Sequence, residues 1–295
     1  MNQEFLTKKL NAYERLMRLD KPIGILLLLW PTLSALLIAG RGQPHWIIVL
    51  IFVTGTVLMR SAGCVMNDIA DRKFDAEVER TKNRPLATGE VSVKEAYWLA
   101  ATLSAFAFLG VCFLNKSVIY LSFVALFLAM TYPFTKRFLA VPQAYLGLAF
   151  GFGIPMAFAA VNDYIPPIAW WLVAANVCWA IAYDTEYAMV DREDDVKIGI
   201  KSSAIFFGKY DVLAIMLCYA AMLGILIYVG KFMGFGKFYY ASLVVAFLLV
   251  VWQYQLIKKR LKTGCFKAFL YNNWIGCAIF VGLAAEYYSR YQMPP

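Results

Sequence analysis

The sequence predicts an all-α, polytopic membrane protein with nine transmembrane helices and a cytoplasmic N-terminus. Of its 295 residues, 61% are hydrophobic and only 16% are charged, which is a far more apolar composition than that of an ordinary soluble domain. Nine apolar stretches each approach the roughly 20 residues that cross a bilayer as a helix. These stretches are residues 23–40, 46–66, 96–114, 117–134, 138–161, 165–183, 212–230, 238–257 and 269–288.

Basic residues are distributed unevenly between the two ends of these spans. If the N-terminus is cytoplasmic, 22 of the 28 Lys and Arg residues lie on that side, five lie on the other, and Arg60 lies within the second span. Because Lys and Arg accumulate in cytoplasmic loops, this bias orients the chain. It also accounts for the net charge of +9 through the anionic lipid surface, so no nucleic-acid partner is expected.

The spans follow one another as a single membrane domain over residues 1–295. The first 21 residues are polar and basic, and the apolar run after them leads into further spans, so we expect an uncleaved anchor. Ser92 and Glu95 have the spacing of a capping box that starts the third span. Pro31 and Pro155 are the two breaks expected within spans.

Two acidic segments follow the second and sixth spans and therefore lie on the cytoplasmic side. They are "NDIADRKFDAEVE" and "DTEYAMVDREDD", and they hold 11 of the 19 acidic residues. Asp71 and Asp191 are 120 residues apart, as are Asp75 and Asp195. This spacing suggests two related four-helix halves, about 23–134 and 138–257, followed by a ninth helix.

Helical spacing places acids of each segment on one face. Asn67, Asp71 and Asp75 are four residues apart, and Asp184, Asp191 and Asp195 follow at seven and four. Two carboxylates at about 4 Å repel by roughly 4 kcal/mol at an effective dielectric near 20. A bound cation would relieve this repulsion. Glu186, Glu193 and Asp194 lie off the second face and are expected to be solvated.

The residue types indicate magnesium as the cation. The only histidine, His45, lies in a short loop, and none of the six cysteines forms a CxxC pair. Oxygen ligands without His or Cys suit Mg2+, which keeps waters and binds substrate phosphates. The alternative is that the acids are solvated helix ends paired with neighbouring Lys and Arg residues.

Several basic residues on the same side could bind a diphosphate directly. Arg60 lies seven residues before Asn67, on roughly the same helical face, and a charge within a span is costly enough to indicate function. Lys136 and Arg137 close a short loop, and Lys197 follows the second acidic segment. Each of these could instead anchor the chain at the membrane surface.

With these motifs in place, the chain resembles the UbiA superfamily of intramembrane aromatic prenyltransferases over essentially its whole length. "RSAGCVMNDIADRKFD" fits the family pattern NDxxDxxxD, and "DTEYAMVDREDD" fits DxxxxxxDxxxD. "YPFTK" and "KIGIKS" are similar to the hydroxybenzoate branch. The resemblance implies nine helices around a central cavity, in the bacterial inner membrane, with an active site that faces the cytoplasm.

The resemblance also implies a reaction of ubiquinone biosynthesis, in which a polyprenyl diphosphate is ionised with Mg2+ and alkylates 4-hydroxybenzoate ortho to its hydroxyl. The implied metal ligands are Asn67, Asp71, Asp75, Asp184, Asp191 and Asp195, of which Asp71, Asp75, Asp191 and Asp195 are also assigned as catalytic. The implied diphosphate ligands are Arg72, Lys136, Arg137 and Lys197.

The remaining roles concern the aromatic acid and the allylic cation. Arg60 is assigned to the carboxylate, because a guanidinium matches it in two hydrogen bonds. Tyr132 and Tyr187 are assigned to the cation, which an aromatic face stabilises by roughly 0.5 to 2 kcal/mol, although core packing is an equal alternative. The base that takes the ring proton stays open, with Asp191 as one option.

Two other functions stay open at this point. An ion-coupled transporter also carries acids in its membrane region, although it would place them in the middle of spans. A prenyltransferase of the same family could instead take another acceptor, such as a naphthoate, a homogentisate, or a haem or chlorophyll substrate.

Overall fold

The computed structural model describes residues 3–75 and 81–292, so Glu77 and Glu79 of the first acidic segment lie outside the described residues. Within these ranges every regular element of secondary structure is a helix. The helices are α1 (Gln3–Met17), α2 (Ile23–Ala39), α3 (Trp46–Asp75), α4 (Val93–Val111), α5 (Lys116–Thr135), α6 (Pro142–Gly151), α7 (Gly153–Asn162), α8 (Pro167–Ile198), α9 (Ser203–Phe207), the 3-10 helix η1 (Gly208–Tyr210), α10 (Asp211–Phe232), α11 (Lys237–Ile257) and α12 (Lys262–Gln292).

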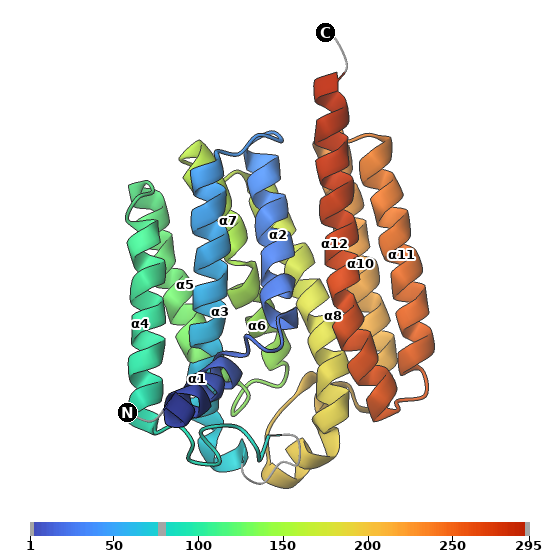
Figure 1. Ribbon diagram of the computed structural model, residues 1–295. Coiled ribbons are helices and arrows are strands. Elements are labelled where there is room, and N and C mark those ends of the chain that lie inside the picture. The colour runs from blue at the N-terminus through green and yellow to red at the C-terminus, as the bar shows by residue number, and fades with distance from the viewer. Residues whose placement is uncertain (1–2, 76–80, 293–295) are drawn as a thin grey trace.

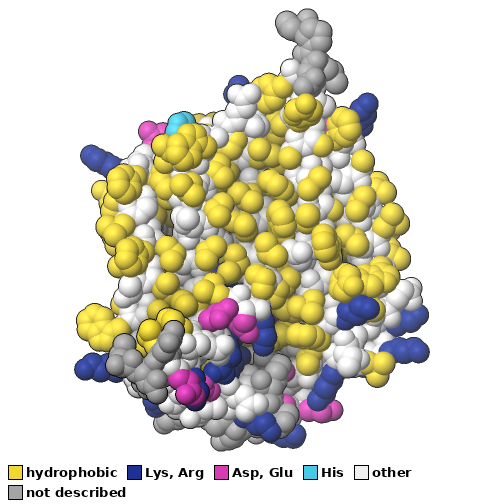
Figure 2. Space-filling model, viewed as in Figure 1, with side chains coloured by type: hydrophobic (Ala, Val, Ile, Leu, Met, Phe, Trp, Pro, Cys, Tyr) yellow, Lys and Arg dark blue, Asp and Glu magenta, His cyan; other side chains and the backbone are white. Residues whose placement is uncertain are grey.

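The longer helices run side by side as a bundle, and α1 lies across its lower end in Figure 1. Helices α3 and α8 both finish at this same lower end, so the two acidic segments are brought to one side of the bundle. Figure 2 shows hydrophobic side chains over the middle of the visible face and charged side chains gathered toward its lower end. This distribution fits a chain that crosses a bilayer.

Among the described residues, six segments are long and apolar enough to cross a membrane. The prediction of a multi-pass membrane protein is therefore supported, whereas the number nine and the orientation stay predictions. Helix α2 is apolar but has only 17 residues. The division of the chain into two four-helix halves also stays a prediction.

The span predicted over 138–161 is formed by two helices of 10 residues each. The interruption falls at Phe152, within the sequence "GFGIP". Pro155 is the third residue of α7, where its missing N–H costs no hydrogen bond of the helix. Helix α6 also packs closely on α8, because a Cβ at Gly147 would lie 2.8 Å from the Cα of Val177.

The ends of the helices near the acidic segments follow local sequence signals. The predicted capping box is confirmed: the Ser92 hydroxyl accepts from the backbone N–H of Glu95, whose carboxylate accepts from the backbone N–H of Ser92. Helix α8 ends at Gly199, which adopts a left-handed conformation (φ 73°) and donates back to Asp195 and Val196. This cap stops α8 one turn after its last aspartate.

Candidate active site

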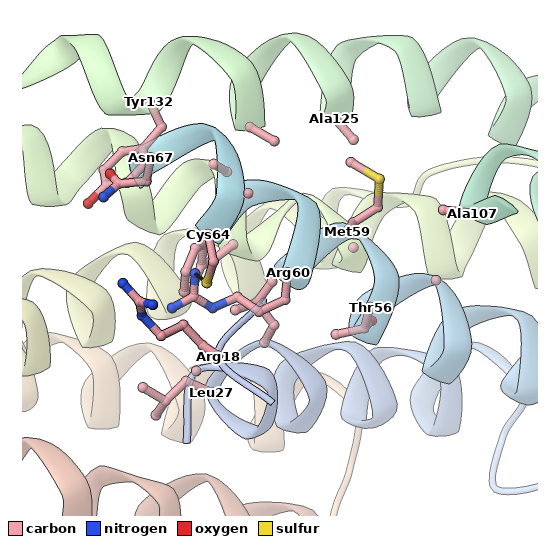
Figure 3. A pocket seen from close by; sticks show the side chains of 18 of the residues that line it. Arg18, Leu27, Thr56, Met59, Arg60, Cys64, Asn67, Ala107, Ala125 and Tyr132 are labelled. Atoms are coloured by element: carbon pink, nitrogen blue, oxygen red, sulfur yellow. Dashed lines mark hydrogen bonds between the residues drawn. The ribbon is translucent and has the colours of Figure 1, made fainter. Parts of the chain in front are cut away.

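Two adjacent cavities lie between the helices. The larger, of about 1180 Å3, is lined mostly by apolar residues of α2, α3, α4, α5 and α7, and the smaller, of about 180 Å3, lies at the acidic helix ends. In Figure 3, Asn67 and Tyr132 lie at one end of the larger cavity, and Thr56, Met59 and Ala107 lie toward the other. The residues that line both cavities are Asn67, Arg84, Tyr132, Asp184 and Tyr187.

The smaller cavity brings together all six residues assigned to the metal, because Asn67, Asp71 and Asp75 of α3 and Asp184, Asp191 and Asp195 of α8 line it. Residues from two segments more than 100 positions apart in the sequence thus face one space. The helical faces that were inferred from spacing point toward each other.

The aspartates of α3 are buried and are held by basic side chains. Lys136 forms an ion pair with Oδ2 of Asp71, and Asn67 donates to the same oxygen at 3.1 Å. Arg84 donates to both oxygens of Asp75, at 2.8 and 3.0 Å. Oδ1 of Asp71 is buried and has no hydrogen-bond partner in the part of the chain that the structure describes.

Asp68, the second residue of the first motif, is held by two arginines. Nη2 of Arg18 lies 3.0 Å from each carboxylate oxygen of Asp68, and Nη1 of Arg84 lies 3.0 Å from Oδ1. Arg84 therefore bridges Asp68 and Asp75. Arg18 belongs to the connection between α1 and α2, so this contact also ties the N-terminal helix to the site.

Glu186 contradicts the expectation that it is a solvated charge. Its side chain is fully buried, on the face of α8 that is turned away from the cavity, and it accepts hydrogen bonds from Tyr219 at 3.1 Å and from Asn272 at 2.9 Å. Asn272 also accepts from Trp179 at 2.8 Å. The prediction was wrong because α10 and α12, not solvent, cover that face of the helix.

Glu193 and Asp194, by contrast, pair with lysines. Glu193 is mostly exposed and forms an ion pair with Lys262 at 2.8 Å, and Asp194 lies 3.4 Å from Lys197. Arg192 lies between Asp191 and Glu193 in the sequence. It pairs with the buried Asp211, which also accepts a hydrogen bond from Arg260 at 2.9 Å. Helix α8 is thus fixed by residues that alternate with its cavity-facing aspartates.

Arg60 lies in the wall of the larger cavity, beside Cys64 (Figure 3). Its Nη1 donates to the sulfur of Cys64 at 2.9 Å, and its Cζ lies 5.4 Å from the centre of the Phe150 ring. Its Nε is buried and has no hydrogen-bond partner among the described residues. Arg60 as a whole is half-buried, and a partly desolvated guanidinium favours an anionic ligand.

Tyr132 and Tyr187, assigned to the allylic cation, both lie where the two cavities meet. The ring of Tyr187 packs against Phe269, with 4.7 Å between ring centres. Two aromatic side chains are therefore placed between the acidic cavity and the apolar one.

The predicted diphosphate ligands are placed unequally. Lys136 lines the smaller cavity, whereas Arg72, Arg137 and Lys197 are exposed and are not among the residues that line either cavity. Arg137 donates to the backbone oxygen of Ala70 at 3.0 Å. The roles of these three residues stay predictions.

Other basic residues line the cavities without being among the predicted diphosphate ligands, although Lys201 was considered beside Lys197. Arg18, Lys21 and Arg84 line the larger cavity, and Arg84 and Lys201 line the smaller. Arg18 and Arg84 both contact Asp68, from 50 and 16 residues away in the sequence. No local sequence pattern reveals such contacts. Lys201 lies in "KIGIKS", the one signal that could have indicated it.

The carboxylate and amide oxygens that line the smaller cavity are of the kind that binds magnesium. Among the described residues, no three Asp, Glu, His or Cys side chains lie close enough together to hold a metal as they stand. Mg2+ needs fewer protein ligands than that, because one or two carboxylates, waters and substrate phosphates complete its shell. The unpaired Oδ1 of Asp71 and the carboxylates around the smaller cavity provide such ligands.

Sequence comparison relates the chain to proteins of one kind. The profile of the UbiA prenyltransferase family matches residues 28–275. The chain is 62% identical to the 4-hydroxybenzoate octaprenyltransferase of Azoarcus sp. (strain BH72) over 282 residues, covering 96% of this chain and 98% of that one. It is 60% identical to the protein of the same name from Dechloromonas aromatica (strain RCB) over 288 residues, 97% of each chain.

Solved structures show the same fold. A UbiA homolog from Aeropyrum pernix K1, in its apo form, superposes with a TM-score of 0.79 at 26% identity, covering 89% of this chain and 97% of that one. A UbiA homolog from Archaeoglobus fulgidus bound to GPP and Mg2+ superposes with a TM-score of 0.71 at 19% identity, covering 94% and 99%.

Proposed function

The chain belongs to the UbiA prenyltransferase family, and we propose that it transfers a polyprenyl group from its diphosphate to the ring carbon ortho to the hydroxyl of 4-hydroxybenzoate. One observation carries the proposal: two acidic helix ends line a small polar cavity that shares five lining residues with a larger, mostly apolar one. A polyprenyl diphosphate has the same division, with a charged head on an apolar tail.

The diphosphate would lie in the smaller cavity. Asn67, Asp71 and Asp75, with Asp184, Asp191 and Asp195, would hold one or two Mg2+ ions there. When bound, Mg2+ supplies Lewis-acid stabilisation of the negative charge on the departing diphosphate. Lys136, Arg84 and Lys201 are close enough to the same space to donate to the remaining diphosphate oxygens.

The prenyl tail would lie in the larger cavity, whose wall between α3, α4 and α5 is built from residues such as Met59, Ala107 and Ala125. The allylic carbon then lies where the cavities meet, next to Tyr132 and Tyr187. As its bond to the diphosphate oxygen breaks, the two aromatic rings stabilise the developing positive charge. The surrounding apolar side chains exclude water, which would otherwise capture the cation.

The aromatic acid would bind with its carboxylate toward Arg60 and its ring toward the allylic carbon. A carbon–carbon bond forms ortho to the hydroxyl, and the ring carbon then loses its proton to a base. Arg60 supports this placement, since it is a half-buried cation in the wall of the same cavity. We propose that the protein lies in the bacterial inner membrane, with this site facing the cytoplasm.

The test is to supply membranes that contain the protein with a polyprenyl diphosphate, Mg2+ and 4-hydroxybenzoate, and to measure the prenylated acid. We expect product and release of diphosphate only when all three are present. Turnover of a naphthoate or a homogentisate in place of 4-hydroxybenzoate would reject the acceptor and keep the reaction.

A further inference from the structure

Gly24, in the first turn of α2, faces the guanidinium of Arg60. A Cβ built on Gly24 would lie 2.5 Å from Nε, 2.5 Å from Nη2 and 2.9 Å from Cζ of Arg60. Equal distances to the two nitrogens and a longer one to the carbon place that Cβ beyond the Nε–Nη2 edge of the guanidinium. The arginine therefore occupies space that every residue other than glycine would fill.

The other sides of the guanidinium are also in contact with the protein. Phe150 lies over its face, and Cys64 accepts from Nη1. Neither partner is an anion, so packing and not an ion pair fixes the position of this charge. Since the Nε–Nη2 edge is turned toward α2, the Nη1–Nη2 end of the fork is the part that a ligand in the cavity can reach.

We propose that Gly24 determines the specificity of the enzyme for an acceptor that carries a carboxylate. This inference rests on the proposed role of Arg60, and it adds the residue that sets where Arg60 lies. Without a side chain at position 24, the guanidinium settles against the backbone of α2 and presents its Nη atoms to the acid. Any larger residue pushes the fork away from α2 and into the space of the aromatic ring.

Gly24→Ala tests the role of Gly24 directly, because the substitution should not disturb the fold. The atoms that the new methyl group meets belong to the end of a flexible side chain, which can move without disturbing the backbone. Alanine is also favoured over glycine within a helix, by about 1 kcal/mol. The variant should therefore fold, while the guanidinium is displaced by the methyl group.

The experiment measures KM for 4-hydroxybenzoate and for the polyprenyl diphosphate in membranes containing wild type, Gly24→Ala and Arg60→Lys. We expect Gly24→Ala to raise KM for the acid by about tenfold, the loss of one charge-assisted contact, and to leave KM for the diphosphate within about twofold. Gly224→Ala is the matched control, because it adds a methyl group to a helical glycine with nothing within 4 Å. It should change neither value.

The outcomes separate this inference from the assignment on which it rests. If Arg60→Lys raises KM for the acid selectively and Gly24→Ala does not, the role of Gly24 is wrong and that of Arg60 stands. If Arg60→Lys affects both substrates equally, the assignment of Arg60 to the carboxylate fails, and the inference on Gly24 fails with it.

The double variant tests whether Gly24 acts through Arg60. In the Arg60→Lys background the guanidinium is gone, so Gly24→Ala should have much less effect on KM for the acid than it has in wild type. Fully additive effects would overturn the inference, because Gly24 would then act independently of Arg60. Lysine also removes the obstacle at Gly24, so this pair remains informative even if Gly24→Ala alone fails to fold.

Discussion

The two acidic helix ends carry similar motifs but are held in place differently. At the end of α3, basic residues contact the aspartates of the motif themselves: Lys136 pairs with Asp71, and Arg84 with Asp75. At the end of α8, the anchors are Glu186 and Arg192, which lie between the motif aspartates in sequence and contact Asn272 and Asp211. Both arrangements turn three motif residues toward one cavity.

This difference shows two ways to keep like charges together near a membrane. A counter-ion on the carboxylate offsets the repulsion directly, but it must be displaced or shared when a metal binds. An anchor on a neighbouring residue fixes the helix itself, whose motif carboxylates line the cavity. We therefore expect substitutions at the α3 end to change metal binding, and substitutions behind the α8 end to change stability.

Removing a motif aspartate should have the largest effect and should affect both ends equally. Asp71→Ala and Asp191→Ala are each expected to lower turnover by at least about 10²-fold to 10³-fold, the cost of losing one group that stabilises transition-state charge. Diphosphate release in membranes measures this, and the amount of inserted protein is compared alongside. Glu193→Ala, at the exposed neighbour that pairs with Lys262, is the control and should retain activity.

Retained activity in either aspartate variant would sink the metal assignment for that end. Loss in Asp71→Ala alone would mean that only the α3 motif binds the metal, and that the similarity of the two ends is confined to their sequences.

Neutralising Lys136 tests whether the counter-ion at the α3 end competes with the metal. Lys136→Met removes a positive charge from Asp71, and charges at about 4 Å interact by roughly 4 kcal/mol at an effective dielectric near 20. Binding of Mn2+ to the substrate-free protein should therefore tighten by about tenfold or more, as measured by titration calorimetry in detergent. Turnover should fall, because the diphosphate loses a donor.

Lys197→Met is the matched change at the α8 end. Lys197 is exposed and pairs with Asp194, not with a motif aspartate, so its loss should leave Mn2+ affinity within about twofold. Weaker Mn2+ binding in Lys136→Met would show that the lysine orders Asp71 for the metal, which is the reverse of competition.

Much of this site could be predicted from the sequence, because the relevant information is periodic. Spacings of four and seven place Asp71 and Asp191 on cavity-facing sides, and Ser92 with Glu95 marks a helix start. Glu186 was misjudged because periodicity separates the faces of a helix but does not say whether protein or water covers each face.

The contacts that tie distant segments together could not be predicted. Arg18 reaches Asp68 from the α1–α2 connection, and Arg84 reaches it from the loop before α4. Each is one of several basic residues in a polar stretch, and nothing local distinguishes it from a residue that serves only to anchor the chain. These partners are fixed by packing between helices, which a single sequence does not encode in a short motif.

Disrupting the anchor behind α8 should reduce stability without a direct effect on the metal. Asn272→Ala removes the acceptor of the buried Trp179 N–H and one of the two donors to the buried Glu186. Each unpaired buried group costs about 1–3 kcal/mol, so we expect the free energy of unfolding to fall by at least about 2 kcal/mol. Thermal unfolding in detergent measures this loss.

The neighbouring Asn273→Ala is the control for that measurement. Asn273 is half-buried and accepts one hydrogen bond, from Trp30 at 2.8 Å, so its loss should be clearly smaller. Equal destabilisation by the two substitutions would mean that the network around Glu186 has no special part in holding α8.

The smallest effect is expected where α1 docks beside the end of α3. Ala12 and Leu16 of α1 are buried, and Lys9 donates to Glu95 at 2.7 Å. The hydrogen bond from Lys9 lowers the pKa of Glu95 from its ordinary 4.5 to about 2. Because the folded-state pKa is the lower one, the pair stabilises the fold above pH 4.5, and this contribution is lost as the pH falls from 4.5 toward 2.

The size of this contribution should be modest, since the Glu95 side chain is 35% exposed and such ion pairs contribute about 0.2–1 kcal/mol. The measurement is the difference in unfolding midpoint between wild type and Glu95→Gln, followed from neutral pH into that acid range, where it should shrink. Glu4→Gln, in a more exposed pair with Lys8 on the same helix, should show almost no difference at any pH. If the wild type and Glu95→Gln lose stability in parallel throughout, the pair of Lys9 with Glu95 contributes nothing to the docking of α1.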